Sequence, residues 1–276
     1  MRSAEAAPPG GGEMDLSPGP FMRQASPRIH EGWDTMQNEF LNALSQPVGF
    51  PVPDWRGAAR PPRSPISGRY CRIEPLDPDA HAGPLFEALS QDREGRLWTY
   101  LSVGPFDSLD AYKASLLAHS MGDDPLCYAI VDGRAEAAVG TASYLRIDPR
   151  AGSIEVGSIT YSPRLQRSAV ATEAMYLMMR RVFEELGYRR YEWKCNALNA
   201  ASRRAAERLG FTYEGLFRQA TVTKGRNRDT AWFSIVDSEW PALKRGFEGW
   251  LDPANFDSEG RQRRPLGALI AAARDK

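Results

Sequence analysis

The stretch that decides the fold runs from Ile154 to Ala174 and reads IEVGSITYSPRLQRSAVATEA. It begins as a strand, continues as a short polar loop, and ends among small residues that open a long helix. Backbone N–H groups at the start of a helix are free to bind an anion, and small side chains allow a phosphate to come close to them. The stretch therefore predicts an anion site, with an ordinary strand-to-helix turn as the alternative.

Regular elements surround this stretch from residue 69 onward. We expect strands at 69–74, 126–131, 138–147 and 153–161, with helices near 84–90 and at 109–119 after the first strand. Turn-rich separators lie at 131–134 and 148–152, and the first contains Asp132-Gly133, a hairpin signal. The last three of these strands are therefore predicted to form an antiparallel meander.

The pattern after the meander alternates between helices and strands. It predicts a helix over 169–186, a strand at 191–195 and a helix over 200–209 that Asn199 caps. Two strands near 212–218 and 229–235 follow, and helices at 241–250 and 266–274 close the chain. One side of the first helix carries the polar residues Glu173, Arg180, Arg181, Glu184 and Glu185. The order predicts an α+β fold with a mixed, mostly antiparallel central sheet flanked by helices.

Length and proline content divide the chain. It has 276 residues, 42% hydrophobic and 25% charged, which excludes a collagen, a coiled coil and a fully disordered chain. Of its 21 prolines, eleven lie between Pro8 and Pro65. We expect residues 1–35 to be a disordered tail, either dispensable or an over-long reading of the gene, and 36–68 to be a proline-rich extended segment. A modest helical pattern covers 34–44. A single folded domain over 69–250 and a C-terminal extension over 251–276 complete the expected organisation.

Several classes of site are not expected. The sequence has no run of eighteen apolar residues and no apolar secretory segment near Met1, so no membrane association is expected. Cys71, Cys127 and Cys195 are an odd number and lack CxxC spacing, and the three histidines are scattered, so neither disulfides nor a metal site is predicted. These features indicate a cytoplasmic protein.

Positive charge is concentrated near the candidate anion site. The chain has 35 basic and 35 acidic side chains, yet residues 161–230 hold 14 Lys or Arg against 7 Asp or Glu. This distribution suits a polyanionic small ligand. The alternative is that Arg180, Arg181, Arg203 and Arg208 lie on solvated helix faces. A nucleic-acid partner is not expected, because the pI is 6.9 and no recognition motif is present.

Two motifs together resemble a known family. They are Gln166-x-x-Ala169-x-Ala171-Thr-Glu-Ala and Asn199-x-x-Ser202, the second followed by Leu209-Gly-Phe211. With the order of elements, they resemble the GNAT superfamily of acyl-CoA-dependent N-acetyltransferases, and within it the branch that contains the ribosomal-protein alanine N-acetyltransferases. The resemblance covers roughly residues 69–239.

The resemblance implies a splayed mixed sheet that admits acetyl-CoA between its central strands. Asn199 matches the position that bonds the pantetheine arm, and 166–171 matches the pyrophosphate loop. The implied cofactor-binding residues are Ser158, Ile159, Gln166, Arg167, Ser168, Ala169, Val170, Ala171, Thr172 and Asn199. Ala169 departs from the family, which usually has glycine there. If that position required a positive φ, alanine would cost about 1 kcal/mol.

Acetyl transfer to an amine needs a proton acceptor for the amine and a proton donor for the leaving thiolate. Glu155, on the strand before the loop, is the candidate base, and a solvent-facing carboxylate is the alternative. Ser202 matches the position that protonates the thiolate, and the N–H groups near Ser158 and Ile159 are placed to polarise the carbonyl. Direct attack without a strong base is a further possibility.

The acceptor and its pocket are open at this stage. Trp98, Tyr100 and Phe106 supply aromatic walls and Asp229 lies opposite, each with core or rim packing as the alternative. The sequence indicates transfer of an acetyl group to a primary amine, with a protein N-terminus as one acceptor. A polyamine, amino acid or amine antibiotic is the second option, and a catalytically silent acyl-CoA-binding module is the third. Trp250, Leu251 and 266–273 either cover a homodimer face or pack on their own domain.

Overall fold

The structure, a computed structural model, describes residues 40–275, and the chain divides into two compact units, up to Trp55 and from Arg56. In the described part of the first unit, Leu41 forms an isolated bridge with Pro47. The side chain of Asn42 accepts hydrogen bonds from the backbone N–H groups of Leu44 and Gln46. Residues 40–44 therefore form a turn where a helix was expected. Residues 34–39 of that helix, and the expected tail at 1–35, lie outside the described residues.

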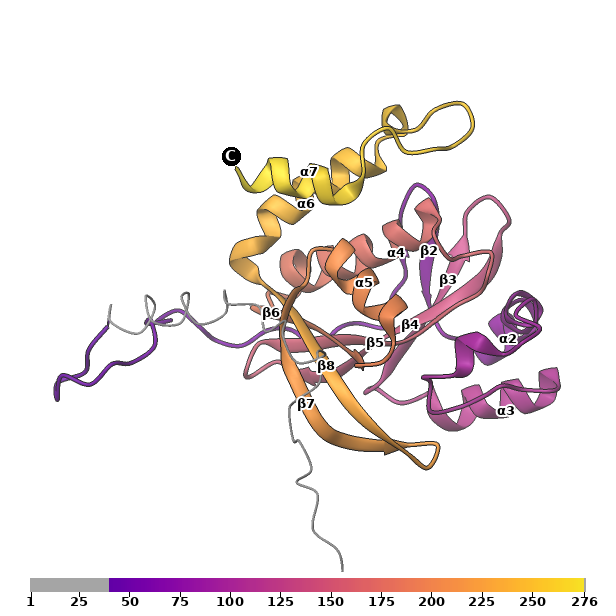
Figure 1. Cartoon of the computed structure of the whole chain (residues 1–276), viewed down its shortest axis with the longest axis horizontal. Coiled ribbons are helices and arrows are strands. Elements are labelled where there is room, and N and C mark those ends of the chain that lie inside the picture. The colour runs from indigo at the N-terminus through magenta and orange to yellow at the C-terminus, as the bar shows by residue number, and fades with distance from the viewer. Residues whose placement is uncertain (1–39, 276) are drawn as a thin grey trace, which may run out of the picture. The chain divides into compact units, whose positions relative to one another are not determined.

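The described part of the second unit is built on one sheet of eight strands, in the order β1-β2-β3-β4-β5-β6-β8-β7 (Figure 1). The strands are β1 (Ile66–Ser67), β2 (Cys71–Pro75), β3 (Leu126–Asp132), β4 (Ala137–Asp148), β5 (Ser153–Tyr161), β6 (Arg190–Asn196), β7 (Thr212–Thr223) and β8 (Arg226–Val236). All neighbours run antiparallel except β5 and β6, which are parallel. The predicted α+β fold with a mixed, mostly antiparallel sheet is confirmed.

Side chains of β3 alternate between two hydrophobic cores, as expected for a strand covered on both faces. Tyr128 and Ile130 belong to the larger core, whereas Cys127 and Ala129 belong to the smaller one. Helices α2 (Pro78–Leu89) and α3 (Leu109–His119) pack on the smaller core. Helix α4 (Ala169–Arg180) packs on the larger core, together with α5 (Ala200–Arg208), α6 (Trp240–Leu251) and α7 (Leu266–Arg274). Figure 1 shows α2 and α3 apart from α4 and α5, with the sheet between the two groups of helices.

Helix α2 begins earlier than the sequence indicated. The sequence indicated a helix near 84–90, and proline favours the first turn of a helix. The structure instead has Pro78 in the first turn, capped by Asp77, whose side chain accepts from the N–H of Asp79, and Pro84 lies inside the helix. Helix α4 also differs, since it ends at Arg180 and the chain continues as a π-helical turn, Arg181–Glu185.

Two charged residues expected on the polar side of α4 are buried. The Glu173 carboxylate accepts hydrogen bonds from the backbone N–H groups of Arg69, Tyr70 and Cys71, at 2.8, 2.6 and 2.8 Å. The Arg181 guanidinium donates to the carbonyl oxygens of Ser64 (2.8 Å) and Pro65 (3.0 Å). Backbone groups of residues 64–71 thus satisfy both charges, and the chain that leads into β2 is held on α4.

The C-terminal helices pack within their own unit. Trp250, Leu251, Leu266, Ile270 and Ala273 are all buried. Gly246 permits the close approach of α6 and α7, because a Cβ atom there would lie 2.6 Å from Cγ1 of Ile270. Of the two alternatives for these apolar residues, packing on their own domain is the one observed. Within residues 40–275, no helix has the length and apolar character needed to span a membrane.

Candidate active site

An opening between two central strands defines the site. Strands β5 and β6 pair only from Ser153–Arg190 to Val156–Trp193. Beyond that point β5 continues against β4, and β6 continues against β8. The backbone groups of Gly157–Tyr161 that face β6 therefore have no partner on that strand. A cavity of about 1920 Å³ begins here, lined by both strands and by the first turns of α4 and α5.

A bulge in β5 directs its backbone toward this cavity. Thr141 pairs with Thr160 and Ser143 with Gly157, so one β4 residue lies opposite Ser158 and Ile159 of β5. Ser158 has a φ of 49°, in the left-handed region that is uncommon for residues other than glycine. Both residues line the cavity. A bulge re-aims the local backbone, so these two residues are the part of β5 best placed to contact a bound carbonyl group.

The start of α4 lines the cavity beside this bulge. Ser168 caps the helix, with its Oγ accepting from the N–H of Ala171 at 3.0 Å. Within the described residues the N–H groups of Ala169 and Val170 have no hydrogen-bond partner, as is usual in a first helical turn. The left-handed residue of the loop is Arg167, with a φ of 60°, whereas Ala169 is helical. Alanine at position 169 therefore carries no backbone strain.

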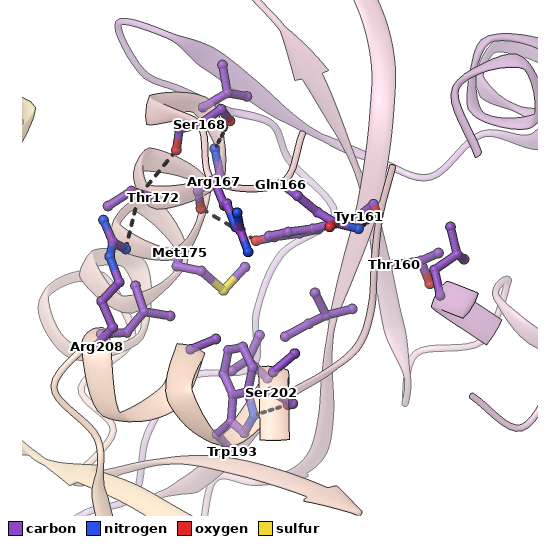
Figure 2. A pocket seen from close by; sticks show the side chains of 18 of the residues that line it. Thr160, Tyr161, Gln166, Arg167, Ser168, Thr172, Met175, Trp193, Ser202 and Arg208 are labelled. Atoms are coloured by element: carbon purple, nitrogen blue, oxygen red, sulfur yellow. Dashed lines mark hydrogen bonds between the residues drawn. The ribbon is translucent and has the colours of Figure 1, made fainter. Parts of the chain in front are cut away.

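Side chains from the loop and from α5 surround the same hollow. Figure 2 shows Gln166, Arg167 and Ser168 before α4, with Arg208 of α5 on the other side. Arg208 donates to Oγ1 of Thr172 at 3.3 Å. Ala171 and Thr172 line the same wall.

The first turn of α5 brings two further candidates to the cavity. The Oδ1 atom of Asn199 accepts from the N–H of Ser202 at 3.0 Å, which caps the helix. The Oγ atom of Ser202 accepts from Nε1 of Trp193 at 3.0 Å (Figure 2). In both side chains the oxygen acts as the acceptor of these bonds. The NH2 group of Asn199 and the hydroxyl hydrogen of Ser202 can therefore still donate to a ligand.

Glu155 is a buried member of the site. Its side chain is 4% exposed, and its carboxylate lies 2.6 Å from Nη1 of Arg146 and 2.9 Å from Nζ of Lys194. Burial raises the pKa of Glu155 above its ordinary value, and the two cations offset only part of that rise. The alternative of a solvent-facing carboxylate is therefore not observed. A carboxyl group with a raised pKa that lines a cavity is suited to accept a proton near neutral pH.

Cations dominate the cavity wall. In the described residues its basic members are Arg69, Arg96, Arg134, Arg146, Arg167, Lys194, Arg204, Arg208, Arg228 and Arg261. Its acidic members are Asp92, Asp132 and Glu155. Arg208 belongs to this wall, whereas Arg180 and Arg203 do not, and Arg181 is buried elsewhere. The imbalance suits a ligand with several negative charges.

The structure brings one of the four expected acceptor-pocket residues to the cavity. Tyr100 lines it and donates its hydroxyl to the carbonyl oxygen of Leu198 at 3.1 Å. Trp98 and Phe106 pack against each other in the smaller core, with ring centroids 5.3 Å apart. Asp229 lies on the β7–β8 hairpin, where its carboxylate accepts from the N–H of Gln219 at 2.6 Å. Trp98, Phe106 and Asp229 are thus placed outside the cavity wall, because core packing and hairpin bonding hold their side chains elsewhere.

Sequence reasoning missed Lys194 and Arg146, the two cations that contact Glu155. Glu192 and Lys194 are two residues apart in a strand, a spacing that places them on one face and could have been noticed. Arg146 has no comparable signal, because it reaches Glu155 from a β4 irregularity where its own φ is 49°.

Comparison with known proteins gives consistent matches. A sequence model of the family described as Acetyltransferase (GNAT) domain matches residues 71–212. A solved GCN5-related N-acetyltransferase from Brucella melitensis is 46% identical, with a TM-score of 0.78, covering 80% of this chain and 100% of that one. A solved structure from Chromobacterium violaceum ATCC 12472, provisionally described as a GNAT-family acetyltransferase, is 39% identical, with a TM-score of 0.66 and coverage of 70% and 96%. A Bacillus subtilis (strain 168) protein with the provisional name ribosomal N-acetyltransferase YdaF is 26% identical over 179 residues, 62% of this chain and 92% of that protein.

Proposed function

The chain belongs to the GNAT family of acetyltransferases, acyltransferases that use acetyl-CoA, and from that premise we propose that it acetylates a primary amine at the cavity between β5 and β6. The observation that carries the proposal is the separation of these parallel strands beside the free N–H groups of α4. The opening suits a narrow polar chain, and the helix start suits its phosphates. The cationic wall supports the same ligand.

Acetyl-CoA is proposed to bind along this wall. The segment Gln166–Thr172, with the N–H groups of Ala169 and Val170, would hold the pyrophosphate, and Arg167 would neutralise part of its charge. The Asn199 amide would donate to a carbonyl of the pantetheine arm. The helical φ of Ala169 removes the reason to expect weak binding, and with it the argument for a catalytically silent module.

Glu155 and Ser202 are the proposed acid–base pair. Glu155 would accept the proton of the acceptor amine, directly or through water, so that the neutral amine attacks the thioester carbonyl. The N–H groups near Ser158 and Ile159 would stabilise the negative charge on the carbonyl oxygen. The Ser202 hydroxyl would donate a proton to the leaving thiolate, since its oxygen already accepts from Trp193.

A protein N-terminus is our first choice of acceptor, supported by the name of the Bacillus subtilis relative. A small amine is the second choice, supported by contacts that tie together the acceptor side. Nζ of Lys224, at the tip of the β7–β8 hairpin, donates to the carbonyl oxygens of Trp98 (2.9 Å) and Gly104 (2.8 Å). Tyr100, which lines the cavity, would line the amine's path.

Two measurements test the proposed function. Titration calorimetry should show acetyl-CoA binding, and absence of binding would overturn the proposal. A thiol-release assay against peptides with free N-termini, polyamines and amino acids should then give turnover with one class. Turnover with peptides alone supports the first acceptor, and turnover with small amines alone supports the second.

Location and organisation complete the proposal. A cytoplasmic location is supported by Cys71, Cys127 and Cys195, which are all free and buried. We propose that residues 69–250 form the acetyltransferase domain and that 251–276 extend it. Homodimer formation is open to measurement by light scattering.

A further inference from the structure

We propose that Lys194 is a positioning residue that holds the Glu155 carboxylate in place at the inner end of the cavity, where β5 and β6 begin to separate, and that Glu192 competes with Glu155 for it. The inference rests on the proposed function, in which Glu155 is the base. It assigns a role to a side chain that contacts the candidate base without being the base itself.

The contacts of Lys194 fix its ammonium group. Nζ lies 2.9 Å from Glu155 and 2.7 Å from Glu192, and the side chain is 7% exposed. The same atom lies 3.7 Å from the ring centroid of Trp232, which stacks on Phe217 at 4.5 Å. An ammonium group has three N–H donors, and that of Lys194 is surrounded by two carboxylates and one aromatic face.

The strand register explains why this lysine meets Glu155. Glu155 and Glu192 are partners in the parallel β5–β6 pair, whose last pair is Val156 with Trp193. Lys194 follows that last pair and shares a face with Glu192, two residues earlier. It therefore lies where the strands begin to separate, beside the carboxylate at the start of the cavity.

The charges around the pair come from three strands, and a neutral donor comes from a fourth. Arg146 of β4 contacts Glu155, and Arg190 of β6 contacts Glu192 at 2.7 Å. Arg190 also contacts Glu214 of β7 at 2.7 Å, and Oγ of Ser234 of β8 donates to Glu214 at 2.6 Å. Glu192 thus has a second cation in Arg190.

Lys194 and Arg146 act unequally on Glu155. The side chain of Arg146 is 61% exposed, so water screens its charge, whereas Lys194 is buried. Burial raises the pKa of Glu155 and the cations lower it. Removing Lys194 should therefore raise that pKa, and neutralising Glu192 should lower it, because Lys194 would then face one carboxylate instead of two.

The experiment is a ¹³C NMR titration of the glutamate side-chain carboxyls, with the Glu155 resonance identified by its loss in Glu155→Gln. In Lys194→Met the Glu155 midpoint should move up by about one to three pH units. In Glu192→Gln the Glu155 midpoint should move down. In Arg146→Gln it should move up, by less than in Lys194→Met. In Lys194→Arg, which keeps the charge, it should stay near the wild-type value. An unmoved midpoint in folded Lys194→Met overturns the proposal. If that variant does not fold, an unmoved midpoint in Glu192→Gln overturns it instead.

Activity separates this inference from the proposed function. With the best amine from the thiol-release panel, the acidic limb of the turnover profile should move in the same direction as the NMR midpoint in each variant. If the acidic limb of the pH profile of turnover stays fixed in the variants while the NMR titration midpoint of Glu155 moves, the positioning role is overturned and the proposal of acetyl transfer still stands. Failure of the wild type to bind acetyl-CoA would instead overturn the proposed function, whatever the NMR midpoints do.

Discussion

Asn199 and Ser202 each use one side-chain atom within the fold and keep another for a ligand. The oxygen of Asn199 caps α5, and its amide nitrogen can still donate. The oxygen of Ser202 accepts from Trp193, and its hydroxyl hydrogen can still be given away. At both residues, a hydrogen bond within the fold is therefore compatible with a second one to a ligand, although the sequence presents the two roles as alternatives.

Replacing Glu155 by glutamine tests the proposed base. The amide keeps the size of the side chain and cannot accept the amine proton, so turnover should fall by about 10²- to 10⁴-fold. The dissociation constant for acetyl-CoA, measured by calorimetry, should stay close to the wild-type value. Unchanged turnover would remove Glu155 from the mechanism and favour direct attack without a strong base.

Ser202→Ala tests the proposed acid. Loss of the hydroxyl should lower turnover by about tenfold or more, because the thiolate then leaves without a proton donor in place. Trp193→Phe is the matched control, since it removes the indole N–H that Ser202 accepts and keeps the hydroxyl. Equal losses in the two variants, measured by thiol release, would mean that Ser202 matters for its contact with Trp193 and not as an acid.

Helix α4 combines a ligand-facing start with a buried anchor. Ser168 caps the end that lines the cavity, and Glu173, five residues later, accepts from three backbone N–H groups at the start of β2 and just before it. Gly68 leaves room for that carboxylate, because a Cβ atom there would lie 2.4 Å from its Oε2. Glu173 thus ties α4 to the chain that leads into β2, one turn after the helix start that lines the cavity.

Glu173→Gln should destabilise the protein by about 3 kcal/mol, because an amide replaces a buried carboxylate that accepts from three backbone N–H groups. Urea unfolding measures the change. Glu87→Gln, at an exposed position of α2, is the matched control and should change the free energy of unfolding little. Equal stability of the two variants would show that the Glu173 contacts add nothing net.

The elements whose bounds the sequence predicted best are those flanked by clear start and stop signals, such as capping or turn residues. Helices α3 and α7 and strand β5 have the expected bounds, 109–119, 266–274 and 153–161. Strands β7 and β8 extend beyond the expected 212–218 and 229–235, because the two strands pair with each other as far as Thr223 and Arg226, although the polar stretch 226–228 does not alternate with apolar residues. The same division holds in the site. Contiguous motifs such as 166–172 could be found, whereas Arg146 depends on an irregularity in β4 that no local pattern encodes.

The whole molecule is electrically neutral, with 35 basic and 35 acidic side chains, yet its cavity wall is basic. A neutral chain with such a wall attracts a polyanion locally without binding anions over its entire surface. Under the proposed function, recognition of acetyl-CoA would rest in part on charges that widely separated elements contribute to one cavity.

Acetyl-CoA binding should accordingly weaken as salt is added. Between about 0.05 and 0.5 M NaCl the dissociation constant should rise on the order of tenfold, because the screening length becomes shorter. Arg204→Gln should weaken binding and flatten this dependence, since Arg204 is an exposed member of the wall. Arg93→Gln, exposed and outside the wall, should change neither. A salt-independent dissociation constant would contradict the electrostatic account.

The early end of the β5–β6 pairing gives the sheet an inner edge in addition to its two outer ones. An outer edge invites any extended chain to add to the sheet, which is a route to aggregation. The inner edge begins at the last pair, Val156 with Trp193, and lies inside the basic cavity instead of on the outside of the sheet. A ligand that lies along it contacts both β5 and β6 and so joins the two halves of the sheet. The ligand would therefore also cover the backbone edge that the fold leaves unpaired.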